Sequence, residues 1–173
     1  MKSIATACLV LFVVSSFLIP PKGGIPVMSS VFSSTMESES TKIQGYYKSN
    51  ADTTVVEIKT EGIDLSYSVP EIKAKAGDIL RIQYINESDM NHNIVLVKGE
   101  EDIRPVGVAA LQAITNDWIP EKEMDRIIAY SALAHAGDTV SFSFKVPPPG
   151  IYPYICTYSA HWTQMQGRLI STE

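Results

Sequence analysis

The sequence predicts an all-β fold, a sandwich or barrel of short strands interrupted by one short helical flap. Short runs of β-branched and aromatic residues recur along the chain from residue 54 onward, and such runs are typical of strands. Clusters of Gly, Pro and Asp separate them, as expected for tight turns. In the run 140–146 apolar residues alternate strictly with polar ones, so one face of that strand should pack on a core while the other meets solvent. Together these observations are typical of a β-sandwich or barrel.

Seven runs are expected to form strands. In each of them β-branched or aromatic residues dominate, and turn residues separate several of the runs. The run 151–156 contains Pro153, which has no N–H to donate to a neighbouring strand, so this strand should lie at a sheet edge or be irregular there. The seven runs are 54–58, 65–69, 79–85, 93–97, 139–146, 151–156 and 168–170.

Between residues 104 and 129 the strand pattern lapses. This segment is first rich in Ala and other apolar residues and then becomes charged, which predicts a short helix or flap inserted between two strands. Leu111 and Trp118 are expected to anchor the flap to the sandwich. A role of the flap in partner binding is the alternative that stays open.

The first 27 residues are interpreted as a signal peptide or an N-terminal membrane anchor. Lys2 is followed by an uncharged, mostly apolar run, 3–19, which has the shape of an export signal. The run is slightly shorter than the about 20 residues of a spanning helix, and no small-x-small cleavage site follows it, so both alternatives stay open. The Ser-rich residues 28–41 are expected to form a flexible linker, and residues 42–173 are expected to form a single folded domain.

Charge and location restrict the possible partners. The chain has 14 basic and 19 acidic residues and a net charge of −5, which argues against nucleic acid, whose phosphates need basic patches. An exported domain is expected, either periplasmic or tethered at the outer face of the cytoplasmic membrane. The acidic clusters 100–102 and 121–125 are interpreted as solubilising, with the steering of a basic redox partner as the alternative. His135 has no second donor at ligand spacing and is expected to be a surface residue.

A metal site is the main functional prediction. Cys156, His161 and Met165 are spaced as Cys-x4-His-x3-Met, which combines a thiolate, an imidazole and a thioether. This donor set, completed by one further His, is that of a blue-copper electron-transfer site, and His92 is the candidate for the remaining position. Soft sulfur donors favour copper over structural zinc, which prefers four strong Cys or His ligands in a tetrahedron.

Cys156 is the only thiol outside the N-terminal apolar run, so it has no partner for a disulfide. Two other interpretations of this residue stay open. It can be a buried inert thiol, or it can be the nucleophile of a catalytic Cys-His pair. Neither interpretation explains Met165, and no acid or amide that would orient the His of a catalytic pair is evident.

Two segments of the chain resemble the azurin/auracyanin branch of the blue-copper (cupredoxin) family. They are Met90-Asn91-His92-Asn93 with the apolar residues 94–97, and Tyr152-Pro153-Tyr154-Ile155-Cys156-Thr157-Tyr158 leading to His161 and Met165. The resemblance extends roughly over residues 68–171. It implies an eight-stranded Greek-key sandwich with copper at one pole, bound by His92, Cys156 and His161 in one plane and by Met165 as the axial ligand.

The same resemblance implies roles for residues around the metal. Asn93 would tie the two ligand loops together by hydrogen bonds, and backbone amides near Thr157 and Tyr158 would tune the thiolate. The ring edge of His161 would reach solvent through an apolar patch. Trp162 would either belong to this docking patch or simply pack against the fold.

The expected function is one-electron transfer by a mononuclear type 1 copper site, with one copper ion per chain, in a monomeric carrier that is not an enzyme. Its expected partners are redox proteins such as cytochromes, or respiratory or photosynthetic complexes. One alternative is a copper enzyme or sensor with an open coordination position, against which the axial Met165 argues. The other alternative is a copper storage or delivery protein. The positions of the six methionines argue against it, because only Met90 and Met165 lie near the proposed site.

Overall fold

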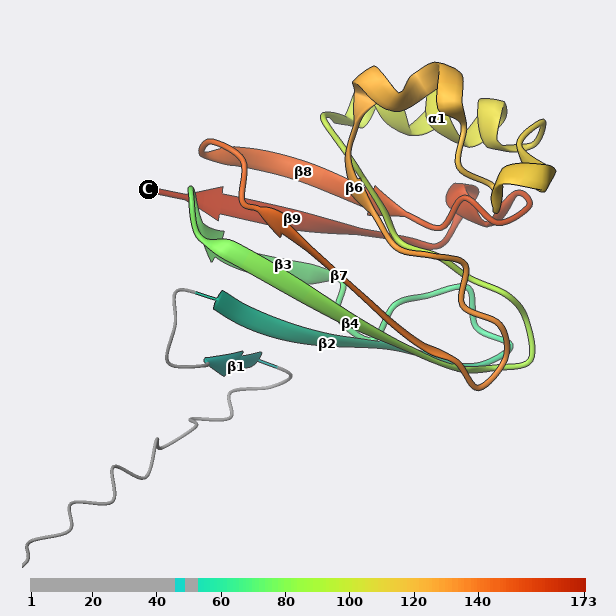
Figure 1. The fold of residues 1–173 in the computed structure, drawn as a ribbon, viewed down its shortest axis with the longest axis horizontal. Helices are drawn as coiled ribbons and strands as arrows, with labels where there is room; N and C mark the ends of the chain where they lie inside the picture. Colours follow the sequence, from blue (N-terminus) through green and yellow to red (C-terminus); the bar gives the residue numbers. More distant parts are fainter. Residues whose placement is uncertain (1–45, 49–52) are drawn as a thin grey trace, which may run out of the picture. The chain divides into compact units, whose positions relative to one another are not determined.

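The computed structural model describes residues 46–48 and 53–173. The predicted leader, 1–27, and the predicted linker, 28–41, lie outside these residues. Within the described part of the chain, no helix is both long and apolar enough to cross a bilayer. The described residues form two facing β-sheets with a helical flap on one of them (Figure 1).

The strands divide into a four-stranded and a five-stranded sheet. The first sheet has the order β1 (Tyr46–Lys48), β2 (Thr53–Gly62), β4 (Ile79–Ser88) and β7 (Thr139–Lys145). The second has the order β3 (Glu71–Lys75), β9 (Gln166–Thr172), β8 (Gly150–Ile155), β5 (Val95–Val97) and β6 (Ile127–Tyr130). The β2–β4 and β3–β9 pairs are parallel and the other pairs are antiparallel. The described residues thus form nine strands, where the resemblance implied eight.

The all-β prediction is confirmed, and the arrangement is a sandwich. Its core lies between the sheets because alternate residues of each strand point inward. In β4, for example, Leu80, Ile82 and Tyr84 are at most 2 % exposed, and they face Leu96 and Leu169 of the other sheet within one buried cluster. Each such aliphatic side chain stabilises the fold by about 1.5–3 kcal/mol. In β7 the predicted alternation is present, with apolar side chains half-buried against the core and polar ones exposed.

One predicted strand is wrong, and three strands, β1, β3 and β6, are not among the predicted runs. The run 65–69 is a loop, although its Tyr67 is buried and donates a hydrogen bond to the Asn93 carbonyl at 2.7 Å. The strand of this region is β3, which alternates charged residues with Ile72 and Ala74 and pairs with β9. β6 begins within the segment 104–129, where no strand is predicted, and β1 precedes the first predicted run. All three are short edge strands, so sheet pairing rather than their own pattern defines them.

Pro153 lies in an interior strand, so of the two predicted alternatives, an edge strand or an irregularity at Pro153, the edge strand is wrong. The strand runs between β9 and β5. Its described pairing with β5 involves only Tyr154 and Ile155, whereas its pairing with β9 extends from Gly150 to Ile155. Pro153 therefore lies just beyond the end of the β5 ladder, where the missing N–H removes no hydrogen bond to that strand.

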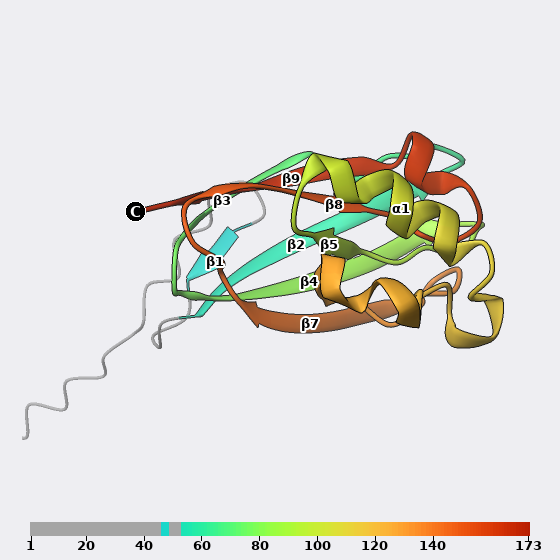
Figure 2. The same ribbon diagram turned by 90° about the horizontal axis from the view of Figure 1, so that it is seen from above.

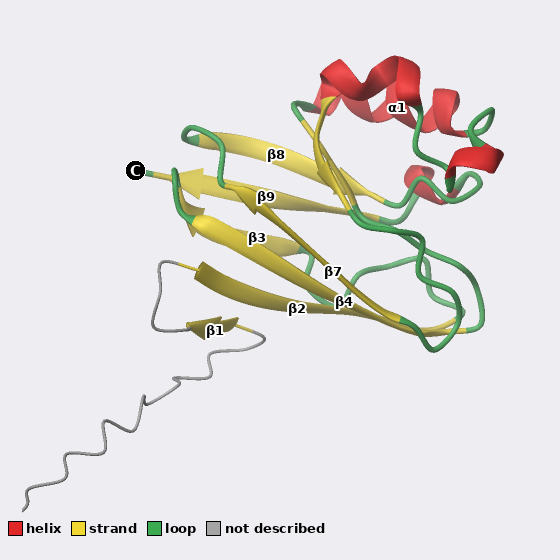
Figure 3. Cartoon of the chain, viewed as in Figure 1, coloured by secondary structure: helices red, strands yellow, loops and turns green. Residues whose placement is uncertain are grey.

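The predicted flap is present between β5 and β6. It consists of α1 (Glu100–Ala110) and two 3-10 segments, η1 (Ile114–Asn116) and η2 (Glu121–Arg126). Seen from above, α1 lies across β8 and β5 (Figure 2), and the helical segments gather on one side of the sandwich (Figure 3). The prediction that Leu111 anchors the flap is wrong, because this side chain is 36 % exposed. The flap is held instead by a second buried cluster of Val95, Val97, Ile103, Val106, Ile119, Ile127 and Ile155.

Candidate metal centre

The four predicted site residues come from two segments at the end of the sandwich. His92 follows β4 and forms an isolated bridge with Ala134, with N–O distances of 3.0 and 2.8 Å. Cys156 comes directly after β8, His161 begins the short turn η3 (His161–Thr163), and Met165 comes directly before β9. The Cys156 amide donates to the Met165 carbonyl at 3.1 Å. The loop that joins β8 to β9 is thus closed at its base, as expected from its spacing.

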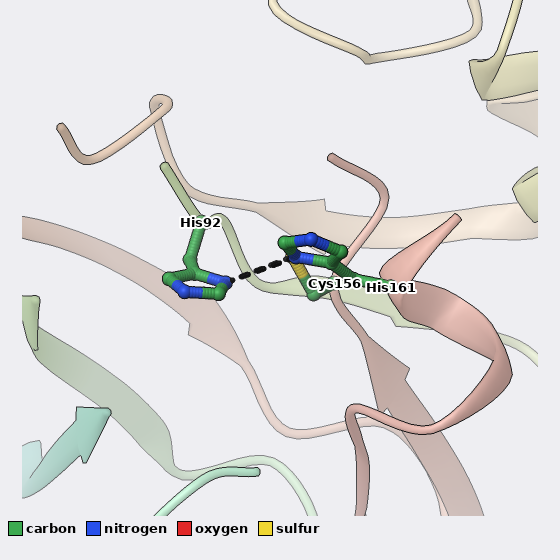
Figure 4. A group of neighbouring side chains, drawn as sticks. All are labelled: His92, Cys156 and His161. Carbon is green, nitrogen blue, oxygen red and sulfur yellow. Dashed lines mark hydrogen bonds between the residues drawn. The ribbon is translucent and has the colours of Figure 1, made fainter. Parts of the chain in front are cut away.

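Three donor atoms of this group point at one another (Figure 4). Cys156 Sγ lies 3.6 Å from His92 Nδ1 and 3.7 Å from His161 Nδ1, and the two nitrogens are 3.2 Å apart. A point in their plane that is equidistant from the three atoms lies about 2.0 Å from each, close to the about 2.0–2.3 Å of metal bonds to imidazole nitrogen and thiolate sulfur. The three side chains therefore fit a single transition-metal ion without rearrangement.

The donor group is buried. His92, Cys156 and Met165 are 0 % exposed and His161 is 9 % exposed. Met165 belongs to the same buried cluster as Cys156. His92 Nε2 is buried and has no hydrogen-bond partner among the described residues, so in this ring only Nδ1 has polar neighbours. Nδ1, which lies 3.6 Å from Cys156 Sγ and 3.2 Å from His161 Nδ1, is therefore the nitrogen that this ring offers to a metal ion.

Burial keeps the apo site neutral. It lowers the pKa of His92 to about 4, and the neighbouring His161 adds to the effect. Burial also lowers the pKa of His161. The pKa of the Cys156 thiol is raised to about 12 by burial, an effect that backbone N–H groups of Asn93 and Tyr158 partly oppose by hydrogen bonding to it. Neutral imidazoles are ready to bind a cation, whereas the thiol must release a proton when a metal binds.

Asn93 joins the two segments. Its Oδ1 accepts hydrogen bonds from the Thr157 amide at 2.8 Å and from the Thr157 hydroxyl at 3.1 Å, while its Nδ2 lies 2.8 Å from the same hydroxyl. Asn93 Nδ2 also donates to the Asp117 carbonyl of the flap at 3.4 Å. The expected tie between the loops is present. One detail differs, because the amides that reach the Cys156 sulfur are those of Asn93 and Tyr158, while the Thr157 amide is used by Asn93.

A polar network under His92 was missed at the level of sequence. The Asn86 side chain, 0 % exposed, donates to the carbonyls of Met90 and Ala134 at 2.7 and 3.0 Å. The Ser88 hydroxyl donates to Asn86 Oδ1 at 2.7 Å. These contacts fix the loop that carries His92 and the segment that bridges to it. A signal was present, because Asn86 and Ser88 continue the inward-facing alternation of Leu80, Ile82 and Tyr84, where polar residues need a specific reason.

Three further residues that the sequence singles out, Trp162, Tyr158 and His135, differ in their surroundings. Trp162 packs against α1, since a Cβ placed on Gly107 would overlap its ring, and this favours the packing alternative. Tyr158 contacts the His161 ring at a centroid distance of 5.2 Å. His135 is exposed, as expected, and is not among the convergent donors.

The depressed histidine pKa values predict acid sensitivity of the copper-free protein. His92 has a pKa of about 4 in the folded state and about 6.5 when unfolded. Between these values the unfolded chain binds more protons, so stability is full above about pH 6.5 and falls as the pH drops toward 4. The loss from His92 is expected to be on the order of 2 kcal/mol. Urea unfolding of the copper-free protein at pH 7.5 and 4.5 measures it.

A control separates this effect from general acid sensitivity. The variant His135→Gln, which alters an exposed histidine, should lose as much stability as the wild type over this range. His92→Gln should lose clearly less. Equal pH dependence in His92→Gln and the wild type would contradict the assignment.

A β-sandwich in which a thiol, two imidazoles and a buried thioether meet at one end is the architecture of a mononuclear blue-copper protein. Residues 54–171 match the family described as copper binding proteins, plastocyanin/azurin family. Auracyanin-A of Chloroflexus aurantiacus is 36 % identical over 120 residues, which cover 66 % of this chain and 72 % of that protein. Auracyanin-B of the same organism is 30 % identical over 121 residues, which cover 68 % of this chain and about half, 52 %, of its own length.

Solved structures agree with these matches. The auracyanin A structure, described as a "blue" copper protein, has a TM-score of 0.66 at 34 % identity and covers 69 % of this chain and 99 % of its own. A dithionite-reduced auracyanin from the photosynthetic bacterium Roseiflexus castenholzii has a TM-score of 0.65 at 30 % identity, covering 71 % and 98 %. The chain belongs to the plastocyanin/azurin family of copper-binding proteins. Members of this family are electron carriers, and the function of the chain is blue-copper electron transfer.

Proposed function

We propose that His92, Cys156 and His161 bind one copper ion in a plane, that Met165 is its axial ligand, and that the chain carries one electron at a time between two redox proteins. The convergence of His92 Nδ1, Cys156 Sγ and His161 Nδ1 at 3.2–3.7 Å supports this proposal most directly. When bound, the ion supplies a one-electron couple between Cu(I) and Cu(II).

The protein residues would make that couple fast and specific. Cys156 binds as the thiolate, and the N–H groups of Asn93 and Tyr158 stabilise the negative charge on its sulfur. The loop closure at Met165 and the Asn93–Thr157 hydrogen bonds hold the donor atoms in place in either oxidation state. Small movement of the ligands means a small reorganisation cost for each electron transfer.

The same geometry favours a carrier over the alternatives. A copper enzyme needs an open coordination position for substrate, whereas four candidate donors here are buried together and no carboxylate of the described residues joins them. A copper storage or delivery protein would expose its donors so that the metal could be passed on. The donors here are 0–9 % exposed. We therefore propose that the chain is not an enzyme and does not deliver copper.

Location and partners follow from the sequence. We propose that residues 1–27 direct export or anchor the chain, that 28–41 form a linker, and that the copper domain, 42–173, acts as a monomer in the periplasm or at the outer face of the membrane. Similarity to auracyanins from photosynthetic bacteria supports partners such as cytochromes or photosynthetic or respiratory complexes.

The visible and electron paramagnetic resonance spectra of the copper-loaded protein test the proposal. An intense blue or green band with a narrow parallel hyperfine splitting, bleached reversibly by one electron per chain, is expected. A weak ordinary Cu(II) spectrum, or one that changes when azide is added, would instead indicate an open site and overturn the carrier assignment.

Met165→Leu is expected to keep the blue colour and to raise the reduction potential. The thioether is a weak axial donor that stabilises Cu(II), and its loss leaves the three donors in the plane intact. Voltammetry and visible spectroscopy of the variant measure both properties. Loss of copper binding in Met165→Leu would show that the thioether is a principal ligand and contradict its axial role.

A further inference from the structure

Two aromatic rings continue outward from His161. The Tyr158 ring contacts the His161 ring edge-on, at a centroid distance of 5.2 Å and an angle of 68°. The Trp118 ring in turn contacts the Tyr158 ring edge-on, at a centroid distance of 5.1 Å and an interplanar angle of 63°. Such edge contacts are favourable ring geometries. Together the three rings form a continuous series, which we call the ring ladder, from the candidate copper ligand to the flap.

Backbone strain is concentrated at this ladder. In the described residues the non-glycine residues with positive φ are Asp117 at 50°, Trp118 at 63° and Ser159 at 52°. The backbone of Asp117 and Trp118 sets the position of the Trp118 ring, and Ser159 directly follows Tyr158. A bulky residue in this conformation is a genuine outlier, and each such residue costs about 1–3 kcal/mol. Such strain persists only where the surrounding structure holds it in place, and it clusters at functional sites.

The strained corner is held in place from both sides. The Trp118 amide donates to the Ala113 carbonyl at 2.9 Å. The Asp117 carbonyl accepts from Asn93 Nδ2 at 3.4 Å, and Asn93 in turn binds Thr157 next to Tyr158. One side chain therefore connects the flap corner, the His92 segment and the Cys156 loop. The ladder is fixed relative to the donor atoms.

The flap that carries Trp118 has an exposed apolar side chain and an excess of acidic residues. Trp118 is half-buried, and the nearby Ile114 is 61 % exposed. The flap, 100–126, contains seven acidic and three basic residues, and one of the bases, Arg126, is already paired with Asp102 and Glu123. Aromatic residues are enriched in protein docking surfaces, and the acidic excess of the flap favours a basic partner.

We propose that Tyr158 and Trp118 are an electron exit route, and that a redox protein with a basic docking face binds over Trp118 on the acidic flap. One electron leaves the reduced copper centre through the His161, Tyr158 and Trp118 rings. The copper centre is oxidised by one electron and the partner, a one-electron acceptor, is reduced by one. No bond forms or breaks, and no proton moves. This proposal rests on the electron-carrier function.

Stopped-flow kinetics with mitochondrial cytochrome c, a basic one-electron acceptor, test the route. The rate constant for its reduction by the Cu(I) protein is measured at low ionic strength for the wild type, Trp118→Leu, Trp118→Phe and Tyr130→Leu. Trp118→Leu is expected to lower the rate constant by about tenfold, while Trp118→Phe, which keeps a ring, retains most of it. Tyr130→Leu is the matched control, since it removes a 43 % exposed aromatic residue outside the ladder, and it should leave the rate unchanged.

A second readout does not depend on electron transfer. In the nuclear magnetic resonance spectrum of the 15N-labelled, diamagnetic Cu(I) protein, added cytochrome c should shift or broaden the Trp118 indole N–H and the amides of 112–122. The effect should decrease as salt is raised from 10 to 100 mM, because the Debye length falls from about 30 to about 10 Å. If added cytochrome c shifts or broadens only signals of residues outside the flap, the proposed docking site is wrong.

The outcomes separate this proposal from the carrier function. Loss of the blue band or of the reversible one-electron couple in the wild type would refute the carrier function itself. If the spectrum and potential of Trp118→Leu equal those of the wild type but its rate constant stays within about twofold, the exit route is wrong and the carrier function stands. A changed potential in Trp118→Leu would show that the ring acts by positioning His161 and would also overturn the exit route.

Discussion

Cys156→Ser is expected to abolish the intense visible absorption of the copper-loaded protein and its reversible one-electron transfer. The band arises from the thiolate bond to copper, and a serine hydroxyl is a harder, far less acidic donor. The side chains are nearly isosteric, and Cys156 is fully buried, so the copper-free variant should remain folded. Visible spectroscopy, voltammetry and circular dichroism of wild type and variant measure the three properties.

The control for this variant keeps the sulfur and changes a distant group. Ser143→Ala alters an exposed position of β7 and should leave the colour and the potential as they are. An unchanged visible band in Cys156→Ser would exclude the thiolate as a ligand. An unfolded copper-free Cys156→Ser would show that the thiol is needed for packing as well.

Among substitutions outside the donor residues, Asn93→Ala is expected to lower the stability of the copper-free protein the most. It removes the acceptor of the Thr157 amide, bound at 2.8 Å, and leaves that buried N–H without its partner. A buried polar group that loses its partner costs about 1–3 kcal/mol, and the lost contacts with the Thr157 hydroxyl and the Asp117 carbonyl bring the expected destabilisation to about 2–4 kcal/mol. Urea unfolding of the copper-free protein measures it.

Copper affinity should fall in the same variant, because Asn93 fixes the His92 segment relative to the Cys156 loop. Loss of a group that orients metal ligands typically lowers metal affinity about 10–100-fold, which competition with a chelator of known affinity measures. Asn116→Ala is the matched control, since this exposed asparagine makes one side-chain hydrogen bond, to the Ile119 carbonyl. Equal stability and affinity in Asn93→Ala and Asn116→Ala would contradict the role of Asn93.

Much of the site could be predicted from sequence because its spacing is local. Cys156, His161 and Met165 lie within one short loop, so their spacing alone brings them together, and few histidines were available for the remaining position. His92 is distant along the chain, yet Nδ1 of this residue lies within 3.6 Å of the Cys156 sulfur. The role of Asn93 came from a family resemblance, and its contacts with Thr157 agree with it.

The parts that sequence did not reveal depend on tertiary contacts. β3 carries only Ile72 and Ala74 among charged residues, and its strand character comes from pairing with β9. The ring ladder requires Trp118 to adopt a positive φ, a conformation that no propensity favours for tryptophan. Leu111 was a plausible flap anchor by composition, but the helix directs Ile103 and Val106 to the sandwich instead.

The close approach of α1 to the copper loop has an evolutionary consequence. Gly107 leaves room for the Trp162 ring, which would overlap even a single added methyl group, so the insertion and the loop that carries His161 fit each other at this point. A larger residue at 107 is tolerated only together with a smaller one at 162. Positions 107 and 162 should therefore covary in sequences that share this insertion, and transplanting the loop into a scaffold with a different helix would require both to be exchanged.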